Sequence, residues 1–176
     1  MKEERKTLPE ATFISIGSNI EPARYLTAAI ARIGDVGRPI RVSRVYQNAA
    51  LSPTPQPDYL NAAVLLETEG APEEIRTKLK SIEVALGRRR SADRYAPRII
   101  DLDLCLLGSI ILKTPAWTLP DPELLERAYL AVPMAEVAPD FIHPLTGEPL
   151  RLIAARLEPA GQLTLRPDLV LRLPDN

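Results

Sequence analysis

The most constraining feature of the sequence is the order in which strand-like and helix-like segments follow one another. Four apolar stretches are rich in β-branched and aromatic side chains, as strands are: residues 11–17, 40–47, 59–68 and 99–108. Apolar side chains at helical spacing occur in two segments that each begin with a proline, 22–33 and 72–86. The order β-α-β-β-α-β predicts an α+β fold of the ferredoxin-like kind, an antiparallel sheet with two helices on one face and additions at the C-terminal side.

The remaining segments carry weaker signals. Residues 1–10 are charged and are expected to form a flexible lead-in to a single domain spanning 11–176. The glycine-containing tripeptide at 17–19 predicts a tight turn after the first strand. Short helices are expected around 123–138. Leucines alternate with polar residues between 163 and 173, which is typical of a terminal hairpin.

Composition argues against several classes of function. The formal net charge is −1, with 22 basic and 23 acidic side chains, whereas nucleic-acid and anionic-membrane binders usually show a basic excess. No apolar run approaches the roughly 18 residues that a membrane span needs, and no signal-peptide core follows the charged N-terminus, so we expect a cytoplasmic protein. The single histidine, His143, excludes a histidine-rich zinc site, and the single cysteine, Cys105, lies in an apolar run typical of a buried thiol.

Two aspartates occupy alternate positions of the strand predicted at 99–108. Asp101 and Asp103 therefore project from the same face, about 6–7 Å apart along the strand. Their neighbours in the strand are apolar, and a buried carboxylate needs a partner. Two hypotheses explain the pair. Either the aspartates form ion pairs with nearby arginines and do no chemistry, or they bind Mg²⁺, with two ions about 3.5–4 Å apart that share phosphate oxygens.

Five arginines precede these aspartates within a few residues: Arg88, Arg89, Arg90, Arg94 and Arg98. Such a charge run is often only a solvated loop. Beside a carboxylate pair, however, guanidinium groups supply what phosphoryl transfer requires, because they neutralise the charge that develops on the phosphate oxygens. The preceding proline stiffens the approach to Arg98, which makes Arg98 the best placed of the five. The sequence contains no Walker A motif and no kinase glycine loop.

A second group of candidate residues follows the proline-rich stretch at 48–57, which cannot form regular structure and is expected to line a pocket. Tyr59 and Asn61 share one face of the next strand. An aromatic ring beside a carboxamide suits a flat heterocycle with hydrogen-bonding edges. The alternative, in which Tyr59 packs in the core and Asn61 is a satisfied buried amide, stays open on side-chain chemistry alone.

Five blocks of sequence, in order, resemble the 6-hydroxymethyl-7,8-dihydropterin pyrophosphokinase family. The blocks fall between Phe13 and Pro144 and read FISIGSN, VSRVYQN, QPDYLNAAVLLET, IEVALGRRR with DRYAPRIIDLDL, and LPDPELLERAYLAVPMAEVAPDF. The resemblance implies transfer of the terminal diphosphate of ATP to the hydroxymethyl group of a dihydropterin, with release of AMP, in folate biosynthesis. It implies ATP as co-substrate and two Mg²⁺ ions. We expect a monomer that binds these small molecules and has no nucleic-acid or membrane partner.

The same resemblance implies a role for individual residues. The metal-binding aspartates of the family match Asp101 and Asp103. Its catalytic arginines, which contact the triphosphate, match Arg88 and Arg98. Positions that bind the pterin, with the adjoining loop, match Asn48, Leu51, Tyr59, Asn61 and Tyr129. Positions that contact ATP or build the loop closing over it match Glu83, Arg90, Arg94, Tyr95, Leu104, Asp121 and Arg127.

The chain departs from the family pattern at several positions. Asp121 stands where the family usually has a histidine that contacts ATP, and a carboxylate is expected to repel phosphate there. Tyr95 stands in place of a tryptophan, and Asn48-Ala49 in place of Thr-Pro. The loop after the first helix is short. Asp121 motivates a second hypothesis, a catalytically impaired pterin- or nucleotide-binding homologue. A third, an RNA-binding module using residues 88–98, lacks the sheet aromatics that such a surface needs.

Overall fold

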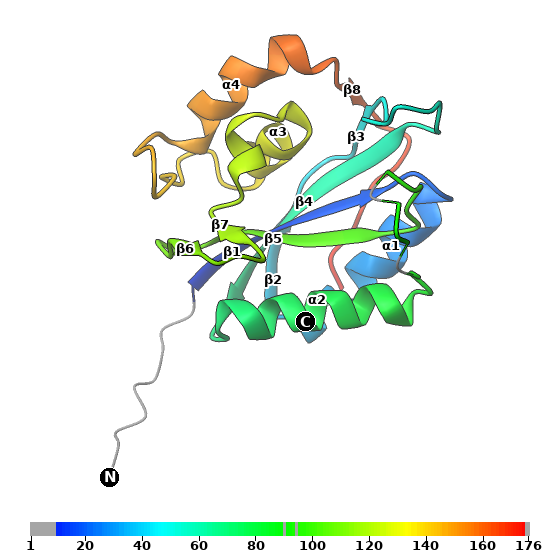
Figure 1. Cartoon of the computed structure of the whole chain (residues 1–176). Coiled ribbons are helices and arrows are strands. Elements are labelled where there is room, and N and C mark those ends of the chain that lie inside the picture. Colours follow the sequence, from blue (N-terminus) through cyan, green and yellow to red (C-terminus); the bar gives the residue numbers. More distant parts are fainter. Residues whose placement is uncertain (1–9, 90, 94, 175–176) are drawn as a thin grey trace.

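The computed structural model describes residues 10–89, 91–93 and 95–174. A single large antiparallel sheet runs through this part of the chain (Figure 1). Its strands are β1 (Glu10–Ser18), β2 (Arg38–Val42), β3 (Tyr46–Asn48), β4 (Tyr59–Thr68), β5 (Asp101–Leu107) and β8 (Thr164–Leu165). They follow the order β5-β1-β4-β3-β8, and β2 also pairs with β4. A separate pair of short strands is formed by β6 (Leu112–Lys113) and β7 (Thr118–Leu119).

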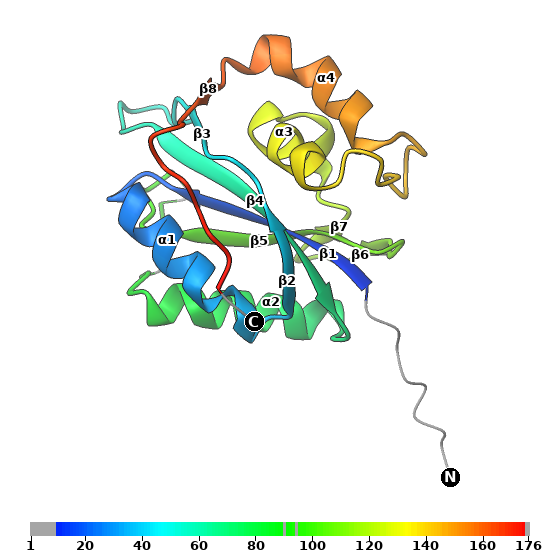
Figure 2. The same cartoon turned by 180° about the vertical axis from the view of Figure 1, so that it is seen from behind.

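Helices lie on both sides of the sheet. On one side are α1 (Pro22–Arg32), which continues into a short 3₁₀ turn, and α2 (Pro72–Ala85). On the other side, α3 (Ala128–Val137) packs on the sheet and α4 (Leu150–Gly161) packs on α3 (Figure 2). A 3₁₀ turn, Pro122–Leu125, leads into α3. The prolines at the starts of α1 and α2 occupy positions whose backbone N–H has no partner within the helix, as their sequence positions predict.

The sheet separates two hydrophobic cores. Alternation in β1 directs Ile14 and Ile16 towards α1 and α2, whereas Phe13 faces α3. The next two positions of β1 on the Phe13 face carry small side chains, Ser15 and Gly17. The α3 side of the sheet is therefore filled at one end and left open at the other, where the site described below lies.

The predicted α+β class is correct, with an antiparallel sheet and helices. The strands predicted at 11–17, 59–68 and 99–108 and the helices at 22–33, 72–86 and around 123–138 all form, with small shifts of their ends. Glu10, predicted to belong to the lead-in, is the first residue of β1; residues 1–9 lie outside the described chain. The tight turn predicted at 17–19 begins later, because Gly17 and Ser18 still pair with β4.

The strand predicted at 40–47 is split. Between β2 and β3, the Ser43 hydroxyl accepts a hydrogen bond from the Ala63 backbone N–H at 2.8 Å. The Ser43 N–H still donates to the Ala63 carbonyl at 2.9 Å. A side-chain oxygen thus takes a position that a backbone carbonyl would fill, and the regular ladder is interrupted.

The predicted terminal hairpin is wrong. Leu165 pairs with Tyr46 of β3, so β8 extends the main sheet instead of pairing with the residues that follow it. The later leucines lie on an extended segment that runs beside α1 (Figure 2), and Leu171 is buried in the core on that side. Their alternation reflects packing of one face of that segment. Helix α4 has no counterpart in the sequence-based prediction.

No helix in the described ranges combines the length and the apolar character that crossing a membrane requires.

Candidate active site

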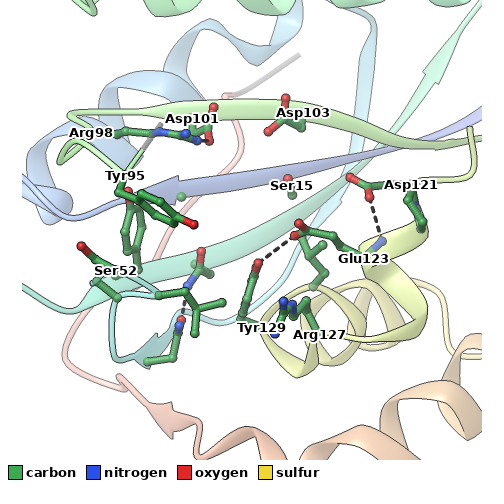
Figure 3. A pocket seen from close by; sticks show the side chains of 18 of the residues that line it. Ser15, Ser52, Tyr95, Arg98, Asp101, Asp103, Asp121, Glu123, Arg127 and Tyr129 are labelled. Carbon is green, nitrogen blue, oxygen red and sulfur yellow. Dashed lines mark hydrogen bonds and ion pairs between the residues drawn. The ribbon is translucent and has the colours of Figure 1, made fainter. Parts of the chain in front are cut away.

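A cavity of about 1100 Å³ opens on the α3 side of the sheet (Figure 3). Its walls come from β1, β4 and β5, from the loop after β3, and from the segment between β7 and α3. This volume lies slightly above the range of about 300–1,000 Å³ that is usual for small-molecule sites, and it suits two substrates held side by side. Most residues predicted for the site line it: Asn48, Leu51, Tyr59, Asn61, Tyr95, Arg98, Asp101, Asp103, Leu104, Asp121, Arg127 and Tyr129.

The two aspartates lie at one end of this cavity, on β5. In the sheet, Asp103 is opposite Ser15 and Asp101 is opposite Gly17 of β1. These small partners leave the space beside the carboxylates open. Figure 3 shows both aspartate side chains on the same side of β5, as the two-residue repeat of a strand predicts.

The two carboxylates have different partners. Asp101 is mostly buried and pairs with Arg98 and, at 2.5 Å, with Nη1 of Arg88. Burial would raise the pKa of Asp101, but Arg98, Arg88 and Lys80 outweigh it and lower that pKa. The Asp103 side chain is 46% exposed, and Lys80 Nζ lies 3.0 Å from its Oδ1. The arginine-pairing hypothesis thus describes Asp101, whereas Asp103 pairs with a lysine.

Three charged side chains, Glu83, Lys80 and Arg88, contact one another and the two aspartates. The Glu83 carboxylate is buried and accepts hydrogen bonds from the Leu102 N–H at 2.7 Å and from Lys80 at 2.8 Å. Nη1 of Arg88 lies 2.8 Å from the same Glu83 oxygen. Burial raises the pKa of Glu83, against the opposing effect of these partners. Glu83 therefore positions Lys80 and Arg88, and its predicted contact with ATP stays a prediction. Arg90 and Arg94 lie outside the described residues.

The carboxylate pair suits a magnesium ion that arrives with a polyphosphate. Within the described ranges, no group of three or more histidine, cysteine, aspartate or glutamate side chains is arranged to hold a metal. Mg²⁺ seldom uses such an all-protein cage; it is usually bound by one or two carboxylates, with phosphate oxygens and waters completing its octahedron. Asp101 and Asp103 provide that partial set of oxygens at the cavity wall.

The other end of the cavity is formed mainly by tyrosine rings and carboxamides, with Glu123 beside Tyr129. Tyr59 and Asn61 of β4, Asn48 of β3 and Tyr129 of α3 all line it. Asn61 Nδ2 donates to Asn48 Oδ1 at 2.5 Å, and the Tyr129 hydroxyl donates to Glu123 at 2.9 Å. Asn61 is thus a buried amide with a hydrogen-bond partner, as the hypothesis of a structural role requires. It also lines the cavity, as the hypothesis of a heterocycle-binding role requires.

Gly17 provides the space that the Asn61 side chain occupies. The two residues are opposite one another in the β1–β4 ladder. A Cβ atom on residue 17 would lie only 2.9 Å from Asn61 Oδ1. Glycine is needed at position 17 because the Asn61 side chain occupies the space that a Cβ atom would take. The tight turn predicted from the sequence does not explain this glycine.

Sequence reasoning missed the residue that links the two ends, Asn19. Its side chain is buried, and its Nδ2 lies 3.2 Å from both the Gln56 side-chain oxygen and the Pro57 carbonyl. Its Oδ1 accepts from the Arg98 N–H at 2.8 Å. Gln56 in turn donates to the Tyr95 carbonyl. Asn19 thus fixes the proline-rich loop and the arginine segment to each other. Its partners are 37 and 79 positions away in the sequence, so no local pattern identifies them.

Asp121 lies in the wall between the two ends. It accepts a hydrogen bond from the Glu123 N–H at 2.9 Å and so caps the 3₁₀ turn before α3. Burial raises the pKa of Asp121 to about 6, with smaller contributions from the charges of Glu123 and Asp103. The carboxyl therefore keeps its proton to a higher pH than an exposed aspartate, but with a pKa of about 6 it is still mostly ionised at pH 7, so the expected repulsion of phosphate stays a prediction. Nearby in the wall, Arg127 Nε is buried without a hydrogen-bond partner among the described residues.

Arg76 and Trp117 form a cation–π pair at the cavity wall. The Arg76 guanidinium of α2 lies 5.1 Å from the ring centroid of Trp117, and both residues line the cavity. This distance is within the range of a cation–π contact. Neither residue was predicted for the site, because the pair joins two segments 41 positions apart in numbering (117 minus 76).

Comparison with known proteins identifies a family. The model of 7,8-dihydro-6-hydroxymethylpterin-pyrophosphokinase (HPPK) matches residues 13–139. A 2-amino-4-hydroxy-6-hydroxymethyldihydropteridine pyrophosphokinase of Methylorubrum extorquens is 35% identical over 85% of this chain and 94% of its own length. The protein of that name from Synechocystis is 34% identical over 90% of this chain and 82% of its own.

Two longer proteins are also similar. The folic acid synthesis protein fol1 of Pneumocystis carinii is 32% identical over 84% of this chain, which spans 20% of that protein. The structure of wild-type Plasmodium falciparum HPPK-DHPS superposes with a TM-score of 0.67 at 12% identity, over 87% of this chain and 45% of that one. This last likeness shows a shared fold. With the family model matching most of the sequence, and two relatives above 30% identity over most of their lengths, the chain belongs to the 7,8-dihydro-6-hydroxymethylpterin-pyrophosphokinase family.

Proposed function

We propose that this protein transfers the pyrophosphoryl group of ATP to 6-hydroxymethyl-7,8-dihydropterin, yielding the pterin diphosphate and AMP for folate biosynthesis. The observation that carries the proposal is the division of one cavity into two chemically different ends. One end presents carboxylates and guanidinium groups, and the other presents tyrosines and carboxamides. A triphosphate and a flat heterocycle need these two environments, placed next to each other.

At the end formed by tyrosines and carboxamides, the pterin lies between aromatic and amide groups. Tyr59 and Tyr129 offer ring faces, and Asn61 with Asn48 reads the hydrogen-bonding edge of the heterocycle. Leu51, which is exposed on the loop after β3, covers the bound ring. The hydroxymethyl oxygen of the pterin is the nucleophile, and it is directed towards the acidic end.

At the acidic end, the triphosphate is held by residues from β5 and the segment before it. Asp101 and Asp103 would hold two Mg²⁺ ions, and these ions would supply neutralisation of the phosphate charge and a lower pKa for the attacking hydroxyl. Arg98 and Arg88 turn from Asp101 to the phosphate oxygens and stabilise the charge of the transition state. Holding both substrates in one cavity supplies much of the remaining rate enhancement. Further ATP contacts come from Glu83, Arg90, Arg94, Tyr95, Leu104, Asp121 and Arg127.

Several broader assignments belong to the same proposal. Residues 11–176 form one domain, with the strand order of the ferredoxin-like topology in β1, β2–β3, β4 and β5. The protein acts as a monomer. It works in the cytoplasm, with small-molecule substrates and without nucleic acid or membrane.

The impaired-homologue hypothesis is less favoured. It rests on Asp121, a single position of the site, whereas relatives that bear the pyrophosphokinase name are similar to this chain over most of its length. The residues with the central roles, Asp101, Asp103, Arg88 and Arg98, are all present.

The test is a nucleotide-product assay with the purified chain. We expect AMP to form from ATP only when both hydroxymethyldihydropterin and Mg²⁺ are supplied. Formation of ADP in place of AMP would contradict the proposed reaction. Pterin binding by calorimetry without any AMP production would instead support the impaired homologue.

A further inference from the structure

Lys80 is the charged residue closest to the acidic pair that the proposed function leaves without a role. It extends from α2 to the edge of the sheet, because β5 is the outermost strand and α2 packs against it (Figure 1). Four oxygens surround its ammonium group. Nζ lies 2.8 Å from Glu83 Oε1, 2.8 Å from the Leu102 carbonyl oxygen, 3.0 Å from Asp103 Oδ1 and 3.8 Å from Asp101 Oδ1.

A purely structural role explains only part of this arrangement. An edge strand leaves backbone groups unpaired, and Glu83 and Lys80 satisfy the N–H and the carbonyl of Leu102. That task does not require a contact with Asp103. The 3.0 Å contact between Lys80 Nζ and Asp103 Oδ1 places an ammonium group directly beside that carboxylate.

A cation in this place competes with a metal. An ammonium group and a divalent ion both seek oxygens at short range, and two cations that share one carboxylate repel each other strongly. The polyphosphate of a nucleotide adds negative charge that offsets this repulsion. A free metal ion brings no such compensation.

We propose that Lys80 is a positioning residue that acts as a tethered cation at the acidic pair, orienting Asp103 before substrate arrives and weakening its affinity for free divalent metal. The protein would in this way favour the metal–nucleotide complex over the free ion. This inference rests on the proposed function, since it assumes that Asp101 and Asp103 are the metal ligands.

The experiment measures binding of Mn²⁺, without nucleotide, to the full chain by electron paramagnetic resonance. In Lys80→Gln the neutral amide can still donate to Glu83 or Leu102, while the charge is removed. We expect Lys80→Gln to bind Mn²⁺ at least about fivefold more tightly than the wild type, and Lys80→Arg to stay near the wild type. Lys78→Gln is the matched control, because it removes the same charge from an exposed position of the same helix, and it should change binding less than twofold.

Equal or weaker Mn²⁺ binding by Lys80→Gln overturns the inference. If that variant fails to fold, Lys80→Met, which keeps the methylene stem, takes its place with the same expectation. Adding Asp103→Asn to the Lys80 variant separates this inference from the proposed function. Loss of the added affinity supports both. Unchanged tight binding in the double variant would show that the metal does not use Asp103, which contradicts the metal assignment itself and the inference that rests on it.

Discussion

Asn19 and the backbone of Arg98 form a two-point contact, one hydrogen bond through the Asn19 side chain and one through its backbone. Asn19 Oδ1 accepts from the Arg98 N–H at 2.8 Å, and the Asn19 N–H donates to the Arg98 carbonyl at 3.0 Å. The same side chain donates to the loop that contains Gln56. The segment bearing the proposed catalytic arginine and the loop beside the proposed pterin site are thus both held by Asn19.

Removing this side chain should therefore affect both ends of the site. We expect Asn19→Ala to lower the free energy of unfolding by about 1–3 kcal/mol, because it leaves the Arg98 N–H unsatisfied. We also expect kcat to fall by roughly 100-fold as Arg98 loses its place. Asn19→Asp keeps the acceptor for Arg98 but loses the donor to the loop, so it should raise the KM for pterin more than it lowers kcat. Chemical denaturation and steady-state kinetics test both variants, and equal effects on kcat would contradict the linking role.

The two aspartates should differ in their effect on stability. Asp103→Asn changes a half-exposed side chain, so we expect the fold to keep its stability while AMP formation falls by roughly 100-fold or more. Asp101→Asn removes the charge that pairs with both Arg88 and Arg98, so we expect a similar loss of activity together with about 1–3 kcal/mol of lost stability. Thermal unfolding and the AMP assay distinguish the two. Near-normal turnover by the double variant would refute the metal assignment.

Gly17→Ala should weaken pterin binding. Its new Cβ would lie 2.9 Å from Asn61 Oδ1 and push the amide from its place at the cavity wall. We expect the Kd for the pterin to rise about tenfold, equivalent to about 1.4 kcal/mol, with a smaller change for ATP. Gly34→Ala is the matched control, since no atom lies within 4 Å of the Cβ position there. Calorimetric titration provides the measurement, and equal effects of the two substitutions would argue against this account of Gly17.

His143 should make the fold sensitive to acid. The ring is fully buried, and its Nδ1 accepts from the backbone N–H groups of Leu145 and Thr146 at 3.3 and 3.4 Å. Burial lowers the pKa of His143 below its ordinary value of 6.5. Above pH 6.5 the histidine is neutral in both the folded and the unfolded chain, so it does not change the free energy of unfolding. Below pH 6.5 the unfolded chain binds a proton that the folded chain does not, and the folded state loses stability. This loss grows as pH falls from 6.5 towards the lowered value.

Urea denaturation at a series of pH values measures this effect. We expect the free energy of unfolding of the wild type to decrease below pH 6.5. His143→Asn offers an acceptor near Nδ1 and cannot be protonated in this range. The variant should show a shallower decrease, and a parallel pH profile would exclude His143 as the source.

The sequence predicted correctly those features that depend on the residue pattern within a single strand or helix. The two-residue repeat placed Asp101 and Asp103 on one face of a strand, and helical spacing located α1 and α2, because these patterns follow from the geometry of a single element. The relation between Lys80 and Asp103 has no such pattern. It depends on which strand forms the edge of the sheet and on how α2 packs beside it, and both are set by the whole fold.

The other differences also come from tertiary contacts. Ser43 interrupts its strand because its hydroxyl meets the backbone of Ala63, 20 residues later. The C-terminal leucines alternate because one side of their segment meets a core already formed by distant helices. In each case the local sequence permits more than one structure, and the partner that decides between them lies elsewhere in the chain.

The contact between Trp117 and Arg76 has a practical consequence for each of these experiments. Trp117 is the only tryptophan in the sequence, and it lines the cavity. Its indole emission is therefore an intrinsic optical reporter of this one place, free from background of other indoles. Ligand entry that alters its surroundings is recorded directly in the unlabelled protein, and Arg76→Met offers a second reference spectrum without the stacked guanidinium.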